Sequence, residues 1–88
     1  MKHVSITVRG RVQGVGFRYN TIQTAKKYNI SGFVSNRMDG SVLIEAEGED
    51  ELLELFIQWC RSGPDWARVD EISISDCPLS GYEGFGIR

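Results

Sequence analysis

Residues 10–18 read GRVQGVGFR and contain the groups of this chain best suited to bind a phosphate-like anion. Glycine adopts positive φ at little steric cost, so the backbone N–H groups of such a turn can converge on one point. A helix that begins after Gly16 would add its first unpaired N–H groups and the positive end of its dipole. Arg18 would contribute a planar set of donors that matches phosphate oxygens. The segment therefore indicates an anion site between a strand and a helix.

Two better-defined phosphate-binding motifs do not fit this segment. A dinucleotide-binding loop would need a third glycine where this chain has Tyr19. A Walker loop would need Lys followed by Ser or Thr after its last glycine, where this chain has Phe17-Arg18. Because glycine-rich turns between strands and helices are common, a plain tight turn without a ligand is the alternative interpretation.

Other side chains of the catalytic or metal-binding type are few. The chain has one histidine, His3, and two cysteines, Cys60 and Cys77. They are too few and too far apart in sequence for a disulfide framework or a four-ligand structural zinc site. Neither cysteine is followed, six residues later, by the arginine of a cysteine phosphatase. We therefore expect no metal and no cofactor, and we interpret the cysteines as small apolar core residues and His3 as a structural or surface residue.

The hydrophobic pattern predicts the elements that would position the glycine-rich loop. Strict alternation of apolar and polar residues indicates strands, and spacing of three to four residues indicates helices. The expected order is strand, helix, strand, strand, helix, strand and a short last strand, at residues 4–9, 17–28, 30–36, 42–47, 50–61, 69–75 and 85–87. This order is typical of the ferredoxin-like α/β sandwich (βαββαβ), with a mostly antiparallel five-stranded sheet and two helices on one face.

Local signals refine these elements. Asn29 suits the left-handed position that ends a helix. Asp39-Gly40 is a strong hairpin signal between the second and third strands, and the alternation slips between Val69 and Ile72, which suggests a bulge. Without further information, Asn36, which directly precedes that hairpin, is better interpreted as making local hydrogen bonds in the turn than as a catalytic residue.

Composition limits the classes of function. With 88 residues, 41% hydrophobic and 25% charged, the chain suits one globular domain over residues 1–88. A net charge of −2 lacks the basic surplus of a nucleic-acid binder. No apolar stretch is long enough for a membrane span or a secretory signal. We expect a cytoplasmic monomer that binds neither nucleic acid nor a membrane.

The motif at residues 10–18, together with Asn36 eighteen residues after Arg18 and then Asp39-Gly40, closely resembles the acylphosphatase family. The resemblance extends over nearly the whole chain. It continues through Ala25, Gly32-Phe33-Val34, Glu47-Gly48, Phe56, Gly63-Pro64, Ala67-Arg68-Val69 and Phe85-Gly86-Ile87-Arg88. Asn29-Ile30, Arg37 and Trp66 depart from the usual pattern, which leaves the substrate preference open.

The resemblance implies metal-free hydrolysis of acyl phosphates to a carboxylate and inorganic phosphate. By motif position it implies that Arg18 and Asn36 are the catalytic residues. The phosphate-binding cradle that it implies is formed by Gln13, Gly14, Val15, Gly16 and Phe17. In some members of the family the terminal carboxylate approaches the catalytic arginine, so we expect the carboxylate of Arg88 near Arg18.

An arginine and an asparagine supply neither a general base nor a nucleophile, so the substrate must already be activated. An acyl phosphate is activated, because its carboxylate leaving group has a conjugate acid with a pKa of about 4 and departs unprotonated. The loose transition state then needs positioning and charge stabilisation. In this reading Arg18 and the loop bind the phosphoryl oxygens, and Asn36 positions the attacking water.

A non-catalytic ferredoxin-like module that binds an anion or a metabolite is the alternative function. RNA binding is a third class for this fold. The strand expected at 42–47 argues against RNA binding, because it lacks the stacking aromatic residues of an RNA-recognition module and carries Glu45.

Overall fold

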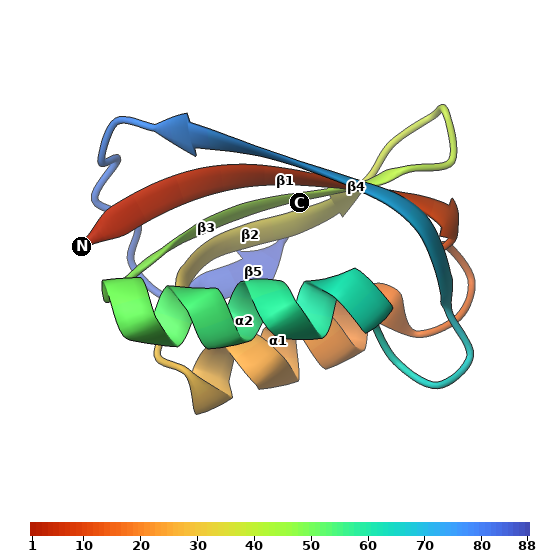
Figure 1. Cartoon of the computed structure of the whole chain (residues 1–88), viewed down its shortest axis with the longest axis horizontal. Helices are drawn as coiled ribbons and strands as arrows, with labels where there is room; N and C mark the ends of the chain where they lie inside the picture. Colours follow the sequence, from red (N-terminus) through yellow and green to blue (C-terminus); the bar gives the residue numbers. More distant parts are fainter.

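The computed structural model describes all of residues 1–88. Its elements are, in chain order, β1 (Lys2–Arg11), α1 (Phe17–Lys27), β2 (Ser31–Asn36), β3 (Val42–Gly48), α2 (Asp50–Ser62), β4 (Arg68–Cys77) and β5 (Phe85–Ile87). The strands form one five-stranded sheet in the order β4-β1-β3-β2-β5. Neighbouring strands are antiparallel except β2 and β5, which are parallel. Both helices cover one face of the sheet (Figure 1), so the predicted ferredoxin-like βαββαβ sandwich is confirmed.

The core lies between this face of the sheet and the two helices. Val4, Ile6 and Val8 alternate along β1 with residues that face the other way, and all three are almost completely buried, as the period of two along a strand requires. The other strands and the helices supply the opposing side chains. These are Val42, Ile44 and Ala46 of β3, Val34 of β2, Phe17 and Ala25 of α1, and Leu53, Phe56, Ile57 and Cys60 of α2.

The two cysteines differ in environment. Cys60 is fully buried in the core, as expected, and burial raises the pKa of its thiol. The same expectation is wrong for Cys77, which lies half-buried at the end of β4 and outside the core cluster. Cys77 faces away from the helices because it pairs directly with His3, which lies on the opposite face of β1 from Val4.

A β-bulge interrupts the β1–β4 ladder where the alternation of the sequence slips. Arg9 pairs with Glu71. Gly10 pairs with Val69, which leaves Asp70 without a partner on β1. A Cβ atom at Gly10 would lie 2.2 Å from a main-chain oxygen of β4, so only glycine fits this close approach. The bulge lies at the end of β1 that leads into the glycine-rich loop.

The element boundaries differ from the predicted ones mainly in β1 and β4. Both strands extend beyond their apolar positions, because backbone pairing between them continues from His3↔Cys77 to Arg11↔Arg68. Asn29 has φ of 55°, which confirms the left-handed position after α1.

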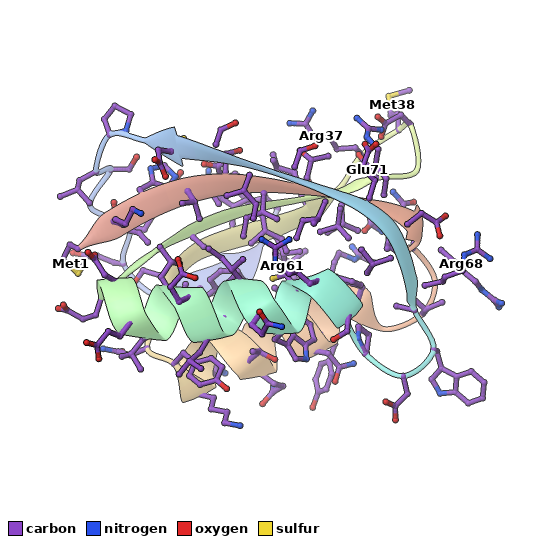
Figure 2. All side chains as sticks on the ribbon, viewed as in Figure 1. Met1, Arg37, Met38, Arg61, Arg68 and Glu71 are labelled. Carbon is purple, nitrogen blue, oxygen red and sulfur yellow. The ribbon has the colours of Figure 1, made fainter.

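Two loops that the sequence associates with function lie at the same end of the sheet. The loop at residues 12–16 connects β1 to α1, and the hairpin at residues 37–41 connects β2 to β3 (Figure 1). Arg37 and Met38 project from the outer side of this hairpin, away from the two helices (Figure 2). The side chain of Arg37, one of the departures from the family pattern, therefore points away from α1 and the loop before it.

The other end of the sheet is crossed by residues 78–84, here called the crossing segment, which lead from β4 at one edge to β5 at the other. Glu47 binds this segment by accepting hydrogen bonds from the backbone N–H groups of Ser80, Gly81 and Tyr82 at 2.7 to 3.1 Å. These donors hold the pKa of Glu47 below its usual value. His3 binds the same segment, since its Nδ1–H donates to the carbonyl of Pro78 at 2.8 Å. The structural role expected for His3 is thereby confirmed.

Neither helix is long and apolar enough to cross a membrane.

Candidate active site

A cavity of about 210 Å³ opens where the 12–16 loop, the first turn of α1 and the end of β2 meet. It is lined by Val12, Gly14, Gly16, Phe17, Arg18, Tyr19, Asn36 and Ile87. Five residues that the sequence and the family resemblance assigned to the site are thus brought together. They are Gly14, Gly16, Phe17, Arg18 and Asn36.

The backbone of the loop at residues 12–16 adjoins this cavity. Gly14 and Gly16 have φ of 73° and 77°, which is the left-handed region that glycine tolerates best. Gly16 is also the N-cap of α1, and no side chain caps the helix there. None of the N–H groups from Gln13 to Tyr19 donates to an acceptor in the protein. Unpaired N–H groups at a helix N-terminus that has no acidic residue in its first turn favour the binding of an anion.

Arg18 is exposed at the cavity, and its guanidinium makes no hydrogen bond or ion pair with the protein. Arg18 is absent from all ion pairs of the structure. The terminal carboxylate forms no ion pair with Arg18, and its expected position near Arg18 stays a prediction. Arg88 is bound elsewhere: its N–H donates to the carbonyl of Val34 at 3.0 Å, and its guanidinium lies 4.2 Å from the ring centroid of Phe33. The donors of Arg18 are thus available to a ligand.

Asn36 lies at the end of β2, on the same face as the buried Val34. This face points toward the helices, so the side chain reaches the cavity beside the start of α1. Its Oδ1 atom is buried and has no hydrogen-bond partner in the protein. Buried carbonyl oxygens without a partner are rare and costly, so this atom is suited to accept a hydrogen bond from a molecule in the cavity.

Two residues assigned to the cradle do not line the cavity. Val15 packs against the hydrophobic core. Gln13 directs its side-chain amide to the hairpin instead, where Nε2 donates to the main-chain carbonyls of Arg37 at 2.7 Å and Ser41 at 2.9 Å. The backbone N–H groups of Gln13 and Val15 nevertheless have no acceptor in the protein.

Three lining residues were not predicted for the site. Val12 is buried below the loop, whereas Tyr19 and Ile87 are 65% and 53% exposed at its rim. Tyr19 follows Arg18 directly, so its proximity could have been expected from the sequence. The place of Ile87 depends on the parallel pairing of β5 with β2, which puts Ile87 opposite Val34. No local pattern in the sequence reveals that pairing.

Comparisons with known proteins agree with this geometry. A family model described as Acylphosphatase matches residues 4–87. The chain belongs to the acylphosphatase family. Similar relatives include acylphosphatases from Thermotoga maritima, 44% identical over 100% of this chain and 98% of that protein, and from Lactiplantibacillus plantarum, 43% identical over 99% and 98%. The crystal structure of acylphosphatase from Bacillus subtilis is similar with a TM-score of 0.97 and 40% identity, covering 100% of this chain and 99% of that chain.

Membership of the acylphosphatase family, with full-length similarity to several acylphosphatases, makes this chain an enzyme that hydrolyses acyl phosphates. The alternative of a non-catalytic binding module is thereby set aside. The cavity suits such a substrate, because Arg18 and Asn36 line it together with the backbone of the loop, and Tyr19 adds a phenol. No carboxylate, imidazole or thiol is among the lining residues. Apart from the phenol of Tyr19, the lining side chains include no group that commonly exchanges a proton.

Proposed function

We propose that Arg18 and the backbone N–H groups of residues 13–19 bind the phosphoryl group, and that Asn36 positions the water that attacks it. The observation that carries this proposal is the buried, unpartnered Oδ1 of Asn36, which lines the same cavity as Arg18. A phosphoryl oxygen carries negative charge and is attracted to N–H donors. A carbonyl oxygen instead accepts a hydrogen bond from water. The N–H donors are therefore suited to bind the phosphoryl group of the substrate, and the side-chain carbonyl of Asn36 is suited to bind the attacking water.

In the reaction the water oxygen forms a bond to phosphorus while the bond from phosphorus to the carboxylate oxygen breaks. The leaving carboxylate needs no proton, and one proton of the water passes to a phosphoryl oxygen of the substrate. Charge spreads over the equatorial phosphoryl oxygens in the transition state, where Arg18 and the loop N–H groups stabilise it. No step requires a metal ion or a general base.

Phosphate titration combined with turnover of benzoyl phosphate tests the two roles separately. Arg18→Gln should lose both phosphate affinity and turnover, because the guanidinium binds ground state and transition state. Asn36→Ala should lower kcat by about 100-fold or more, the scale of removing one well-placed catalytic group, while phosphate affinity stays within about threefold. Arg11→Gln is a matched control, since Arg11 is an exposed arginine of the same segment that does not line the cavity.

The outcome for phosphate binding decides the assignment of Asn36. If folded Asn36→Ala binds phosphate as poorly as Arg18→Gln does, Asn36 belongs to the cradle and the proposed role in positioning water is wrong. If Asn36→Ala keeps full turnover, the unpartnered Oδ1 has no part in the reaction.

We also propose that residues 1–88 form one domain that acts as a monomer. The buried apolar residues all belong to one cluster, and the large exposed hydrophobic residues are spread over several elements, from Met1 to Ile87. Light scattering should give the mass of a single chain, and a dimer mass at micromolar concentration would contradict the proposal.

A further inference from the structure

His3, Glu45 and Cys77 form a cluster of potential metal ligands at the end of the sheet remote from the cavity. One ligand atom from each, an imidazole nitrogen, a carboxylate oxygen and the thiol sulfur, lies within 4.8 Å of the other two. The three residues come from β1, β3 and β4, which are neighbours in the sheet. They share one face, because Cys77 pairs with His3, and Glu45 pairs with Ser5, two residues along from His3.

The surroundings of the cluster resemble the supporting contacts of protein metal sites. The Nδ1–H of His3 donates to the carbonyl of Pro78 at 2.8 Å, which leaves Nε2 directed at Glu45. Histidine ligands usually donate their second ring N–H to a carbonyl or carboxylate in this way. The second carboxylate oxygen of Glu45 accepts a hydrogen bond from Ser5 Oγ at 2.6 Å. The orientations of both side chains are thus set by contacts that a metal ion would not disturb.

We propose that His3 Nε2, Glu45 Oε1 and Cys77 Sγ bind one Zn²⁺ ion, with a water molecule as the fourth ligand. The ligand set favours zinc, because Zn²⁺ binds nitrogen, sulfur and carboxylate oxygen in tetrahedral geometry. Mg²⁺ and Ca²⁺ prefer sites made mostly of oxygen, and here only one ligand is a carboxylate.

The fit requires only a small rearrangement. Nε2 of His3 and Oε1 of Glu45 are 2.6 Å apart and share a proton in a hydrogen bond. In a tetrahedral zinc site with bonds of about 2.0 Å, two such ligand atoms would be about 3.3 Å apart. The two side chains therefore separate by less than about 1 Å when the ion replaces the proton. Cys77 is half-buried, and its Sγ lies 3.8 Å from the carbonyl oxygen of Ser75, a weak contact that the thiolate would give up on binding the ion.

The exchange balances charge. Zn²⁺ replaces the Nε2 proton of His3 and the thiol proton of Cys77, and both protons leave to solvent. Two positive charges enter and two leave, so the cluster keeps its net charge. Metal binding of this kind is coupled to deprotonation of the ligands.

The ion would stabilise the fold without taking part in the reaction. It would join three strands at the start of the crossing segment, whereas the cavity lies at the other end of β1. From His3 to Val12 the chain runs roughly 30 Å at about 3.3 Å per residue. Met1 accordingly lies at the opposite end of the structure from Met38 of the hairpin (Figure 2).

Titration of the chelator-treated full chain with Zn²⁺ tests the site, with Co²⁺ as a spectroscopic substitute. One Zn²⁺ should bind per chain, and Co²⁺ should show a thiolate-to-cobalt charge-transfer band together with the visible bands of tetrahedral geometry. Cys77→Ser should remove the charge-transfer band and weaken Zn²⁺ binding at least tenfold. His3→Gln should weaken binding similarly. Glu51→Gln is the matched control, since Glu51 belongs to the acidic group of Glu49, Asp50 and Glu51, which could attract divalent ions weakly.

Alkylation of the unaltered chain tests the proposed zinc site without the use of a variant. Zn²⁺ should protect Cys77 from alkylation in the folded protein, while Cys60 is unreactive with or without the ion because it is buried. Absence of one-to-one binding at micromolar Zn²⁺ would overturn the proposal. So would binding that persists in Cys77→Ser and is lost in Glu51→Gln. Turnover of benzoyl phosphate should be the same with and without the ion, so the outcome does not depend on the proposed catalytic roles.

Discussion

The side-chain amide of Gln13 donates a hydrogen bond to the main-chain carbonyl of Arg37, with Nε2 and O separated by 2.7 Å. Arg37 directly follows Asn36 in the chain, and the same Nε2 also donates to the carbonyl of Ser41 at 2.9 Å. One side chain thus joins the loop at residues 12–16 to both ends of the hairpin. The position of the cradle relative to Asn36 therefore depends on this bridge as well as on the sheet.

Replacement of Gln13 by a neutral residue should impair turnover through position alone. Gln13→Met keeps a side chain of similar length but removes the donor to both carbonyl oxygens. Each lost hydrogen bond is worth about 1 kcal/mol. We expect kcat/KM to fall by about tenfold, which corresponds to 1.36 kcal/mol, with most of the change in kcat. Steady-state kinetics with benzoyl phosphate measure this.

Gln58→Met provides the control for Gln13, because Gln58 is an exposed glutamine of α2 that makes no side-chain hydrogen bond. Equal kinetics for Gln13→Met and the unaltered chain would show that the sheet alone positions Asn36.

Turnover should not require a divalent metal. The residues that line the cavity offer no carboxylate, imidazole or thiol to bind one, and Arg18 together with the loop N–H groups supplies the positive charge. We expect kcat/KM to be unchanged in excess chelator. Loss of activity in chelator, with recovery on addition of Mg²⁺, would contradict the proposed mechanism.

Asp39 should make the hairpin sensitive to acid. Its carboxylate accepts hydrogen bonds from Ser41 Oγ and Ser41 N, and then from Arg9, and these donors lower the pKa of Asp39 below its ordinary value of 3.8. A carboxylate whose pKa is lower in the folded state contributes stability that is present above the unfolded-state pKa and is lost as the pH falls toward the folded-state pKa. The unaltered chain should therefore lose stability from about pH 4 downward more steeply than Asp39→Asn does.

Urea unfolding midpoints at a series of pH values measure this difference. Asp65→Asn is the control, because Asp65 is exposed and has neither a hydrogen bond nor an ion pair. The assignment to Asp39 fails if Asp39→Asn and the unaltered chain show the same dependence on pH.

Glu47 should control how firmly β5 is attached to the sheet. Glu47→Gln places an amide NH₂ group against backbone N–H groups of the crossing segment, so at least one of them loses its acceptor. We expect a lower unfolding midpoint and faster hydrogen exchange at the Arg88 amide, which donates from the end of β5 to Val34. Glu54→Gln, on the exposed face of α2, should change neither. Unchanged exchange at Arg88 in Glu47→Gln would show that pairing with β2 suffices to attach β5.

Much of the fold could be predicted from the sequence, because the local pattern and the tertiary contacts agree. The alternation in residues 42–47 reflects one face packed on helices, and the Asp39-Gly40 signal marks the hairpin that forms. The bulge was visible as a slip in alternation near Val69. Strand ends were harder to predict, since β1 extends to Arg11 through backbone pairing that is independent of side-chain type.

The candidate site was only partly predictable. The loop and Arg18 follow from general chemistry, but the importance of Asn36 came from family resemblance. The contact between Gln13 and the hairpin joins two separate loops, which no local pattern encodes. The guanidinium of Arg88 packs on Phe33 of the open sheet face, and a short terminal strand gives no sign of that contact.

The pairing of β1 with β4 also bears on how the chain reaches its fold. His3 pairs with Cys77 and Arg11 with Arg68, so one side of an inner strand is completed only by residues close to the C-terminus. Closing so long a segment costs entropy before the contacts stabilise it, and topologies of this kind fold more slowly than helical bundles of similar length. During synthesis, the backbone N–H and C=O groups along that side of β1 have no strand partner until residues 68–77 have left the ribosome. The sheet is therefore finished long after its inner strand β1 has been made.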